Sequence, residues 1–396
     1  MKKVRKHYID LKSISKNRGL VGDLFPSRYR FSPYRGCQHG CRYCDGRAEK
    51  YYVEGDFEKD IVVRKNIPQL VEEELSSIRE KGIISISSGV SDPYHPLEEE
   101  ERIVERTLQV IEKYNLPISI MTKSSLILRD IDILERINKK SGVTVMVSLT
   151  FLDESLASFF EPRANSVEER LTVIKKFKER GIGVGVLAMP FIPYISDSKE
   201  SMDEFFSKLE EIGVDFVSPG DLTLRPGKQK ELFMEGIRAN YPALYSKLNY
   251  LYGENRPSGI MRSSYRNKLY KKIYHLLDQY SISYLFPHSL YKGKLPLYDE
   301  VYLLLVHMKE LYYRKGVDVK PLEVVVKRYV NWLEGERSKF NRRRSLNYTD
   351  LEQELLFLLH SGGFLDLIGN KKVNEFIKEI ILEEKVFDYV SLSNKA

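Results

Sequence analysis

The pattern that most constrains the fold is a regular alternation of strand-like and helix-like segments between residues 28 and 218. Short apolar segments rich in β-prone residues alternate with longer segments in which apolar residues recur every three or four positions. The expected strands are 28–34, 83–88, 117–122, 143–149, 183–188 and 215–218, and the expected helices are 66–81, 97–114, 126–140, 166–180 and 199–212. Repeated strand–helix steps build a parallel sheet, which right-handed crossovers curl. The sequence therefore predicts an α/β fold, a partial (β/α)6 barrel of the TIM type.

Every cysteine of the chain lies in the short segment that follows the first expected strand. Cys37, Cys41 and Cys44 have the spacing C-x3-C-x2-C. A cubic [4Fe-4S] cluster has four irons, so three cysteines leave one iron free for a ligand that carries an amine and a carboxylate. This is the signature of radical SAM proteins, in which S-adenosylmethionine (SAM) binds the open iron and is reductively cleaved to a 5'-deoxyadenosyl radical.

Other interpretations of this segment were weighed against the cluster. His39 could supply a fourth ligand for a structural zinc, although all four ligands would then come from one short loop without a second C-x2-C pair. A ferredoxin-like electron carrier would need a fourth cysteine, which the sequence lacks. Disulfides are disfavoured because the number of cysteines is odd and nothing resembles a secretion signal. The spacing favours the iron–sulfur cluster, with zinc as the main alternative.

Charge and tyrosine are unevenly distributed along the chain. The 396 residues have a formal net charge of +7, and the excess lies after residue 226, where 28 Lys and Arg face 20 Asp and Glu. The same part holds 17 of the 26 tyrosines. Its expected helices are 227–247, 265–279, 297–314, 322–335, 349–358 and 372–384. We therefore expect an N-terminal arm at 1–24, a radical SAM partial barrel at 25–226 and a basic, helical C-terminal domain at 227–396.

Two segments of the second half contain basic residues but no acidic ones. Residues 256–277 combine six Lys and Arg with three tyrosines, and residues 337–348 include the run Arg342-Arg343-Arg344. Basic groups contact phosphates, and aromatic rings stack on unpaired bases. We therefore expect nucleic acid as a partner of the basic C-terminal domain. The alternative is an ordinary solvated helix face with its tyrosines turned inward.

Polar residues follow the carboxyl ends of successive expected strands, where the chemistry of β/α barrels collects. Ser91 and Asp92 follow the second strand, and Lys123 follows the third. Ser148 lies at the end of the fourth strand, and Arg163 follows it in the chain. Each residue alone could be a turn former or a solvated side chain. Their recurrence after successive strands predicts a site at the barrel mouth.

Four motifs resemble the radical SAM proteins of the spore photoproduct lyase type. They are GCQHGCRYC at 36–44, SDPY at 91–94, TKS at 122–124 and EPRA at 161–164. The resemblance covers residues 25–225.

The resemblance implies specific roles for residues of this chain. It implies a [4Fe-4S] cluster on Cys37, Cys41 and Cys44, and SAM held partly by Ser91, Lys123 and Ser148. Lys123 would suit the carboxylate of SAM by its charge. Arg163 is a further candidate for cofactor binding, and Tyr43 and Asp92 are the candidate catalytic residues.

The chain departs from the lyase type at two positions. The lyase has a hydrogen-donating cysteine two residues before the matching serine, where this chain has Gly89. The lyase also has a tyrosine on each side of its third cluster cysteine, whereas here Tyr43 is retained and Asp45 replaces the second. Because the sequence has no thiol outside the cluster segment, this hydrogen-return route is missing. The expected function is a lyase-like radical SAM enzyme with an unassigned substrate, not a photoproduct lyase.

Two alternative functions remain. One is radical chemistry on a small molecule or a peptide, and the other is a non-catalytic iron–sulfur or zinc module that binds nucleic acid. No segment approaches the ~20 apolar residues of a membrane span, so we expect a soluble, cytoplasmic protein without a membrane partner. A reducible cluster also implies an electron donor such as flavodoxin or ferredoxin.

Overall fold

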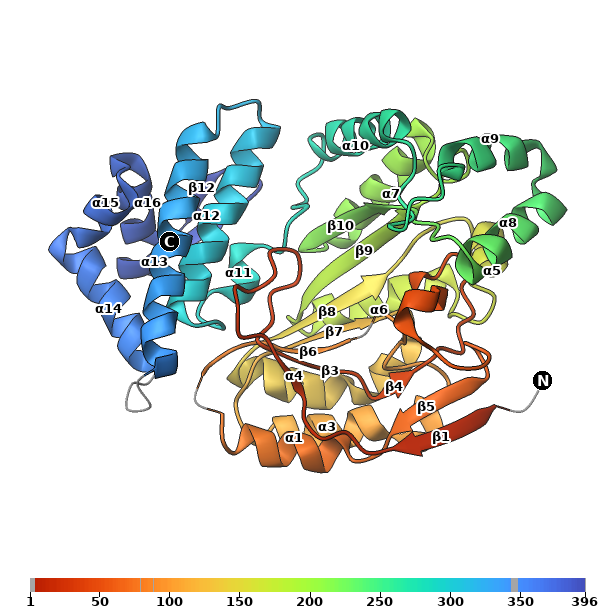
Figure 1. Ribbon diagram of the computed structural model, residues 1–396, viewed down its shortest axis with the longest axis horizontal. Helices are drawn as coiled ribbons and strands as arrows, with labels where there is room; N and C mark the ends of the chain where they lie inside the picture. The colour runs from red at the N-terminus through yellow and green to blue at the C-terminus, as the bar shows by residue number, and fades with distance from the viewer. Residues whose placement is uncertain (1–3, 79, 88, 343–347, 396) are drawn as a thin grey trace. The chain divides into compact units, whose positions relative to one another are not determined.

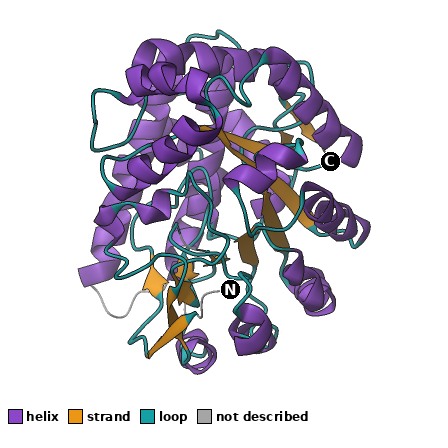
Figure 2. Cartoon of the chain, turned by 90° about the vertical axis from the view of Figure 1, so that its right-hand side faces the viewer, coloured by secondary structure: helices purple, strands orange, loops and turns teal. Residues whose placement is uncertain are grey.

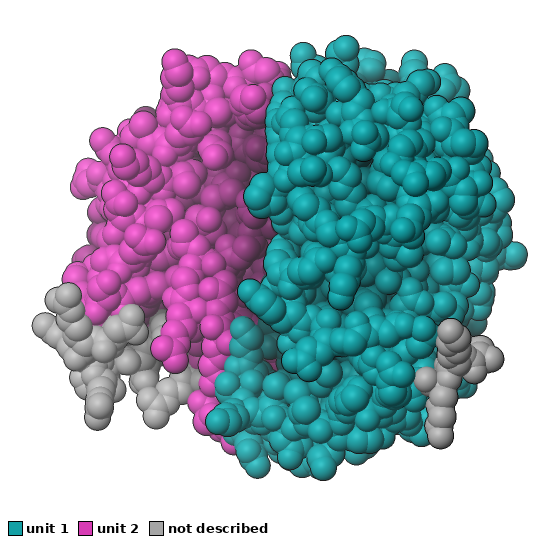
Figure 3. Space-filling view, turned by 45° about the vertical axis from the view of Figure 1, so that its right-hand side comes forward, with its two compact units in different colours: residues 1–15, 30–75, 85–284 teal, residues 16–29, 76–84, 285–396 magenta. Residues whose placement is uncertain are grey.

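The computed structural model describes residues 4–78, 80–87, 89–342 and 348–395. The chain forms two compact units, which Figure 3 shows in different colours. Unit 1 contains residues 1–15, 30–75 and 85–284, and unit 2 contains residues 16–29, 76–84 and 285–396. Each unit is therefore assembled from segments that are far apart in the sequence.

The larger sheet has seven strands in the spatial order β10-β9-β8-β7-β6-β3-β2 (Figure 1). The strands are β2 (Ser15–Lys16), β3 (Tyr29–Phe31), β6 (Ile84–Ile86), β7 (Ile118–Thr122), β8 (Val143–Ser148), β9 (Gly183–Phe191) and β10 (Phe216–Asp221). From β7 to β10, each strand pairs in parallel with the next. Five of the six expected strands and the first part of the sixth, 28–34, lie in this sheet, side by side in sequence order from β3 to β10. The predicted α/β fold with a partial (β/α)6 barrel is confirmed.

Helices line the sheet along one side in Figure 2. The helices of this region are α1 (Ile67–Leu75), α2 (Glu98–Glu101), α3 (Ile103–Ile111), α4 (Ile131–Lys140), α5 (Glu154–Phe160), α6 (Val167–Glu179) and α7 (Lys199–Ile212), with the short 3-10 helices η1 (Asp45–Arg47), η2 (Glu49–Tyr51) and η3 (Ser125–Asp130). Helices α4 and α6 contact β8, and α6 also contacts β9. The buried residues of α4 recur at helical spacing, because one apolar side must be covered.

The N-terminal segment differs from the expected arm, because it adds a strand to a second sheet. There β5 (Asp60–Arg64) pairs in parallel with β1 (Arg5–Ile9) and antiparallel with β4 (Tyr34–Arg35). Strand β1 is mostly exposed, so it carries no apolar period that the sequence could reveal. The expected strand 28–34 is split between β3 and β4, and the break falls at Pro33, which has no N–H to donate.

The expected helix at 97–114 is broken into α2 and α3 at Arg102, whose backbone is left-handed (φ +49°). The cause is the buried carboxylate of Glu98. It accepts the backbone N–H groups of Ile103 (3.0 Å) and Val104 (2.9 Å), which are the first residues of α3. Glu98 therefore caps the start of α3, which lies inside the segment where the apolar spacing predicts one continuous helix.

Residues 227–284 belong to unit 1, so the compact units divide the chain differently from the expected boundary at 226. This segment contains α8 (Lys228–Asn240), α9 (Pro242–Tyr252) and α10 (Ser263–Leu277). Helix α10 contacts α7 and β10. The buried side chain of Gln229 in α8 donates to the backbone carbonyl of Tyr43 (3.1 Å). Contacts of this kind join α8 and α10 to the barrel.

Unit 2 is mainly helical in its described part. It contains α11 (His288–Tyr291), α12 (Leu297–Arg314), α13 (Lys320–Arg342), α14 (Tyr348–Ser361), α15 (Gly363–Ile368), α16 (Lys371–Leu382) and the antiparallel pair β11 (Val386–Asp388) and β12 (Ser393–Lys395). Helix α12 has the bounds that the sequence predicts. Of the expected basic run, Arg343 and Arg344 lie outside the described residues. Among the described helices, none has the length and apolar character to cross a membrane.

Four charged side chains of unit 2 form a buried group, which we call the Arg28 cluster: Arg28, Glu80, Asp299 and Arg337. Arg28 Nε donates to Asp299 (2.7 Å), and Arg337 Nη2 donates to the other oxygen of the same carboxylate (3.0 Å). Arg28 Nε also lies 3.3 Å from Glu80. Buried charges are tolerated only when they are paired in this way.

Candidate active site

The cysteine loop, residues 36–44, connects β4 to the short helix η1. Its two glycines are both in the left-handed region, with φ values of +84° at Gly36 and +71° at Gly40. At Gly40 a Cβ atom would collide with the guanidinium of Arg163, so the close approach also requires glycine. The motif spacing therefore sets the backbone path of the loop as well as the spacing of the sulfurs.

Backbone bonds fix the positions of the cysteines. The N–H of Cys37 donates to the carbonyl of Phe57 (2.9 Å), and Nε of Arg47 donates to the carbonyl of Cys41 (2.9 Å). Arg47 is itself paired with Glu58. The loop is therefore held from the side of residues 47–58.

The three thiols are free, and burial raises the pKa of Cys37, Cys41 and Cys44. Buried thiols ionise readily only when positive charge, such as a metal, compensates them. Within the described residues, no group of three or more His, Cys, Asp or Glu side chains surrounds a position for a single metal ion. In an iron–sulfur cluster each thiolate binds a different iron. Three free thiols in one short loop are the donor set of a cluster with three cysteine ligands and one open iron, so the residues present fit such a cluster.

The segment after β6 lies directly against the cysteine loop, as the sequence predicts. The Ser91 hydroxyl donates to the carbonyl of Gly36 (2.6 Å), and the N–H of Gly36 donates to the carbonyl of Val90 (3.2 Å). A Cβ at Gly46 would lie 2.9 Å from the carbonyl of Gly89, so the two backbones are in close contact. Ser91 is thus beside the loop, with its hydroxyl engaged by the backbone.

Asp92 is a buried organising residue of the site. Its carboxylate accepts the Thr122 hydroxyl (2.7 Å) and the backbone N–H of Lys123 (2.7 Å), and it lies 3.2 Å from Nε2 of His39. Burial alone would raise the pKa of Asp92, but His39 and these hydrogen bonds outweigh burial and lower the pKa to about 2. Asp92 therefore joins the cysteine loop to the end of β7. The catalytic role expected for it stays a prediction.

Lys123, Glu161 and Arg170 form the most buried charged group near the cysteines, and with Tyr43 and Thr150 they make up what we call the Glu161 cluster. Arg170 Nη1 lies 2.7 Å from Oε2 of Glu161, and Lys123 Nζ lies 3.4 Å from Oε1. The hydroxyls of Tyr43 and Thr150 donate to Oε1 as well. Burial alone would raise the pKa of Glu161, but the charges of Lys123 and Arg170 lower it to about 2. The carboxylate is ionised at neutral pH.

Ser148 and Arg163 are placed differently from each other. Ser148 ends β8, and its carbonyl accepts Nη1 of Arg170 (3.1 Å). Arg163 is about half exposed, donates through Nε to the carbonyl of Gln38 (2.6 Å) and pairs with Glu58. Arg163 therefore clamps the cysteine loop from outside, and its expected contact with the cofactor stays a prediction, as does that of Ser148.

Sequence reasoning missed the role of Arg170. This side chain is fully buried although its charge suggests a surface residue. The other buried positions of α6, Val167, Val173, Ile174 and Phe177, are apolar and share one helical face with Arg170. An arginine at an apolar position of a helical period is the signal that could have identified it.

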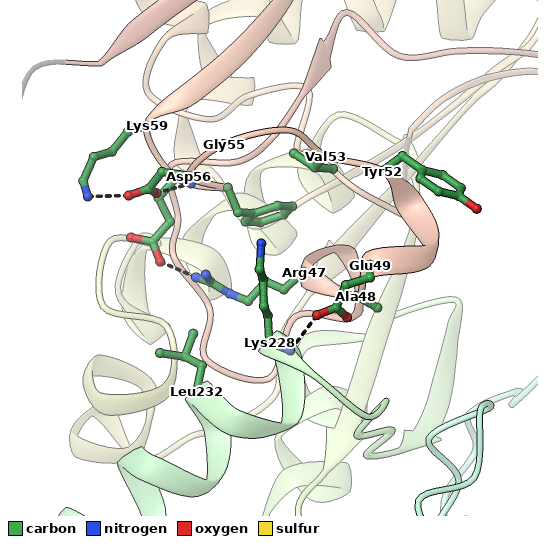
Figure 4. A pocket seen from close by; sticks show the side chains of 12 residues that line it. Arg47, Ala48, Glu49, Tyr52, Val53, Gly55, Asp56, Lys59, Lys228 and Leu232 are labelled. Atoms are coloured by element: carbon green, nitrogen blue, oxygen red, sulfur yellow. Dashed lines mark hydrogen bonds and ion pairs between the residues drawn. The ribbon is translucent and has the colours of Figure 1, made fainter.

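A cavity of about 700 Å³ lies beside the cysteine loop, on the side of η1 and η2 (Figure 4). Its lining residues include Arg47, Phe57 and Lys59. The lining charges are engaged locally: Arg47 pairs with Glu58, Lys59 pairs with Asp56, and Glu49 accepts the backbone N–H that begins α8. None of the site residues expected from the sequence lines it.

Comparisons with known proteins agree with this geometry. The profile of the Radical SAM superfamily matches residues 31–207. An uncharacterized protein of Mycobacterium tuberculosis is 28% identical over 265 residues, which cover 65% of this chain and 76% of that protein. An uncharacterized protein of Acidianus two-tailed virus is 32% identical over 215 residues, 50% of this chain and 68% of that protein.

Among solved structures, a cysteine-to-serine variant of spore photoproduct lyase is similar, with a TM-score of 0.50 and 16% identity. The match covers 69% of this chain and 79% of the lyase. A tyrosine-to-phenylalanine variant of the same lyase matches with the same TM-score. Residues 31–207 of this chain form a domain of the radical SAM superfamily, and the fold is similar to that of spore photoproduct lyase over 69% of the chain.

Proposed function

We propose that the protein holds a [4Fe-4S] cluster on Cys37, Cys41 and Cys44. One electron from an external donor would then split bound SAM into methionine and a 5'-deoxyadenosyl radical, which takes a hydrogen atom from the substrate. The observation that carries the proposal is the cysteine loop. It gathers all three thiols of the chain, all free and two of them buried, and Lys123 at the end of a parallel strand is close enough to lower the pKa of Cys41 by its charge.

The chain's own residues would bind and orient the cofactor. Lys123 follows β7 and its side chain is 14% exposed, so its ammonium can pair with the carboxylate of SAM. Ser91 follows β6 and Ser148 ends β8, the two strands on either side of β7, and further hydrogen bonds to SAM would come from these positions. Asp92 contacts both the backbone N–H of Lys123 and His39 of the cysteine loop, so it holds these two parts of the site in position.

Two further features follow from this chemistry. Thiolates that must stay reduced suit the cytoplasm better than an oxidising compartment. The cluster also needs a one-electron donor, for which a flavodoxin or a ferredoxin is the appropriate class of protein.

The test is anaerobic reconstitution with iron and sulfide, followed by an assay for 5'-deoxyadenosine with dithionite and SAM. Wild-type protein should form it, and Cys41→Ala should lose both the cluster absorbance and the product. Iron-loaded, reduced protein that forms no 5'-deoxyadenosine would overturn the proposal. So would spectroscopic detection of a single tetrahedral zinc.

We also propose that the substrate is a nucleic acid other than the spore photoproduct. The sequence has no thiol outside the cysteine loop, so the lyase-type return of hydrogen from cysteine is not available. Packing does not impose this absence, because a Cβ at Gly89 would meet no atom within 4 Å. The substrate radical must therefore be quenched by a route other than the return of a hydrogen atom from a cysteine.

The support for nucleic acid comes from a surface of α8, α9, the loop after β9 and the residue before α10, which we call the tyrosine–arginine surface. Its members are Tyr194, Arg238, Tyr245, Lys247, Tyr250 and Arg262. Three cations of this set lie over three tyrosine rings, at 4.4 Å for Arg238 and Tyr245, 5.6 Å for Lys247 and Tyr194, and 4.4 Å for Arg262 and Tyr250. Helix α9 has no acidic residue. Exposed aromatic rings beside cations form the stacking sites of proteins that bind single strands.

The basic segment 256–277 contributes less than its composition suggests. Arg266 pairs with Asp221 (2.9 Å), and Lys272 donates to the carbonyl of Asp197. The Tyr265 hydroxyl donates to the Asp197 carboxylate (2.6 Å). These contacts attach α10 to the barrel, so their charges are not available to phosphates. Lys268 and Lys271 are exposed.

Fluorescence anisotropy with a labelled single-stranded oligonucleotide tests this second proposal. Tyr250→Ala should weaken binding about tenfold, since stacking of one base contributes on the order of 1–3 kcal/mol. Tyr313→Ala is a matched control, because Tyr313 is 65% exposed in unit 2 and Tyr250 is 64% exposed. Equal affinities of the two variants, or no binding by wild-type protein at low salt, would contradict a nucleic-acid substrate at this surface and favour a small molecule or a peptide.

A further inference from the structure

The Glu161 cluster places two cations on one buried carboxylate. We propose that Arg170 and Glu161 act as a positioning pair for Lys123. Arg170 neutralises Glu161, so Lys123 is held near the cysteine loop while its charge stays available for the carboxylate of SAM. This inference rests on the proposed function, because it assumes that SAM binds beside the cysteines.

The two cations contact Glu161 unequally. Arg170 Nη1 is 2.7 Å from Oε2, whereas Lys123 Nζ is 3.4 Å from Oε1. Hydrogen bonds between ionised groups are normally about 2.7–2.9 Å long. Arg170 therefore makes the closer ion pair with Glu161, although Oε2 accepts no hydrogen bond of good geometry within the described residues, and Lys123 makes a looser pair that an incoming carboxylate can replace.

Burial assigns the two cations different roles. The side chain of Arg170 is 1% exposed, and two backbone carbonyls hold it, those of Ser148 (3.1 Å) and Ser166 (3.4 Å). The side chain of Lys123 is 14% exposed, and an ammonium carries three donors on a flexible stem. Arg170 is fixed and enclosed. Lys123 is the member of the cluster that can turn towards a ligand.

The charge balance explains why both cations are needed. If Lys123 turns to SAM, Glu161 keeps Arg170 and the hydroxyls of Tyr43 and Thr150 as partners. Without Arg170, Lys123 would be the only ion-pair partner of Glu161 in the described part of the chain. Leaving that carboxylate unpaired in the interior is strongly unfavourable. Lys123 would then remain on Glu161, and the binding of SAM would weaken although Arg170 does not touch SAM.

Equilibrium dialysis under anaerobic conditions tests this inference on cluster-loaded protein in its oxidised state, in which SAM binds without turnover. The two ligands are SAM and decarboxylated SAM, which lacks the group that Lys123 would bind. We expect Arg170→Gln to raise the Kd for SAM about tenfold, the size of one charge-assisted hydrogen bond. The Kd for decarboxylated SAM should change by less than about twofold.

A second-site variant separates positioning from a merely structural role. In Glu161→Gln/Arg170→Gln the carboxylate that would retain Lys123 is gone, so the Kd for SAM should return to within about threefold of wild type. Arg170→Lys keeps the charge and should also bind nearly as wild type. The inference is overturned if Arg170→Gln weakens the binding of SAM and of decarboxylated SAM equally. It is also overturned if the double variant binds SAM as poorly as Arg170→Gln.

Folding is checked by thermal melting of each variant. If Arg170→Gln does not fold, the single variant Glu161→Gln tests the inference instead. This variant removes the carboxylate that holds Lys123, so it should bind SAM at least as tightly as wild type. Tenfold weaker binding by that variant would overturn the inference. Failure of the proposed function has a different signature, since wild-type protein would then not bind SAM at all.

Discussion

Unit 1 and unit 2 each bury a carboxylate between two cations, but the two groups differ in charge balance. In the Glu161 cluster two cations face one carboxylate. In the Arg28 cluster two arginines face two carboxylates. The first group therefore has one more cation than carboxylates, whereas the second has equal numbers of both.

The pKa values reflect this difference. The neighbouring cations outweigh burial at Glu161 and lower its pKa to about 2. Burial dominates at Asp299 and raises its pKa to about 7, since Asp299 shares Arg28 with Glu80, and Glu352 adds a further negative charge nearby. Glu161 is therefore ionised at neutral pH, whereas Asp299 is only partly ionised there.

Exposure completes the contrast. The most exposed member of the Lys123–Glu161–Arg170 group is a cation, Lys123 at 14%, whereas the most exposed member of the Arg28 cluster is a carboxylate, Glu80, also at 14%. A group whose accessible member is a carboxylate is not suited to bind an anion. A group with excess charge and one accessible cation can also bind an anion. We therefore expect changes in the Arg28 cluster to affect stability, and changes in the Glu161 cluster to affect ligand binding.

The largest effect is expected for Arg28→Leu. This change leaves Asp299 and Glu80 without their shared cation, and breaking a buried pair costs about 3–5 kcal/mol of unfolding free energy. Trp332, the single tryptophan, lies in α13 of unit 2, so its fluorescence during denaturation with urea reports on this unit.

The control for Arg28→Leu is Lys371→Met, which removes an exposed cation of α16 that pairs with Glu375 at 3.9 Å. Exposed pairs contribute less than about 1 kcal/mol. If both variants lost the same small amount, the Arg28 cluster would not be the structural support that we infer.

The second effect is a pH dependence that Asp299 imposes on stability. Its pKa of about 7 in the folded state lies above the ordinary aspartate value of about 3.9. Between these pH values the folded state holds a proton that the unfolded state has lost, so stability falls as pH rises and levels off above about 7. The total loss is on the order of a few kcal/mol.

Asp299→Asn isolates this contribution, because asparagine does not titrate and all other groups are unchanged. Urea denaturation of both proteins at pH 5, 6, 7 and 8 should show the wild type losing stability relative to the variant. Parallel curves would show that Asp299 keeps its charge throughout this range, and the two clusters would then be alike.

The sequence predicts the elements better than the clusters, for a physical reason. Helices α7 and α12 have the bounds that their apolar period predicts, because one side of each helix must be covered. Strand β1 escaped prediction because backbone pairing with β5 defines it, and its side chains are mostly exposed. Likewise, the break at Arg102 depends on the buried carboxylate of Glu98, and the spacing of apolar residues gives no sign of it.

Ion pairs across long separations are harder still to predict. Arg28 and Asp299 are 271 residues apart, and nothing in either segment points to the other. The cysteine loop is the opposite case, because its ligands are adjacent in the sequence and their chemistry is specific. Lys123 falls between these extremes: its position after a strand was predictable, but its partner Arg170 was not.

The third effect is expected for Lys123→Met, which keeps the length of the side chain and removes its charge. Loss of a charge-assisted contact should weaken the binding of SAM about tenfold or more, which corresponds to about 1.5–3 kcal/mol of binding free energy. Unfolding free energy should change by less than about 1 kcal/mol, because the ammonium is partly solvated and Glu161 keeps Arg170. Equilibrium dialysis and urea denaturation measure the two quantities. If Lys123→Met lost stability but bound SAM normally, the Glu161 cluster would support the fold and not the ligand, contrary to the difference that we infer between the two clusters.

The smallest effects are expected for a matched pair of buried hydroxyls. The Thr150 hydroxyl donates to Glu161 (3.2 Å), and the Tyr329 hydroxyl in unit 2 donates to the carbonyl of Tyr298 (2.8 Å). Thr150→Val and Tyr329→Phe each remove one buried hydroxyl at nearly constant volume, so each should lose about 1 kcal/mol of unfolding free energy; the Thr150 hydroxyl also contacts Tyr43 (3.0 Å) and the carbonyl of Met189 (3.2 Å). Thr150→Val should also alter the affinity for SAM by about twofold, since one partner of Glu161 is lost and Lys123 is retained more firmly. Tyr329→Phe should leave that affinity unchanged. A change of equal size in both variants would mean that SAM affinity follows stability in general, and that the Glu161 cluster has no separate role.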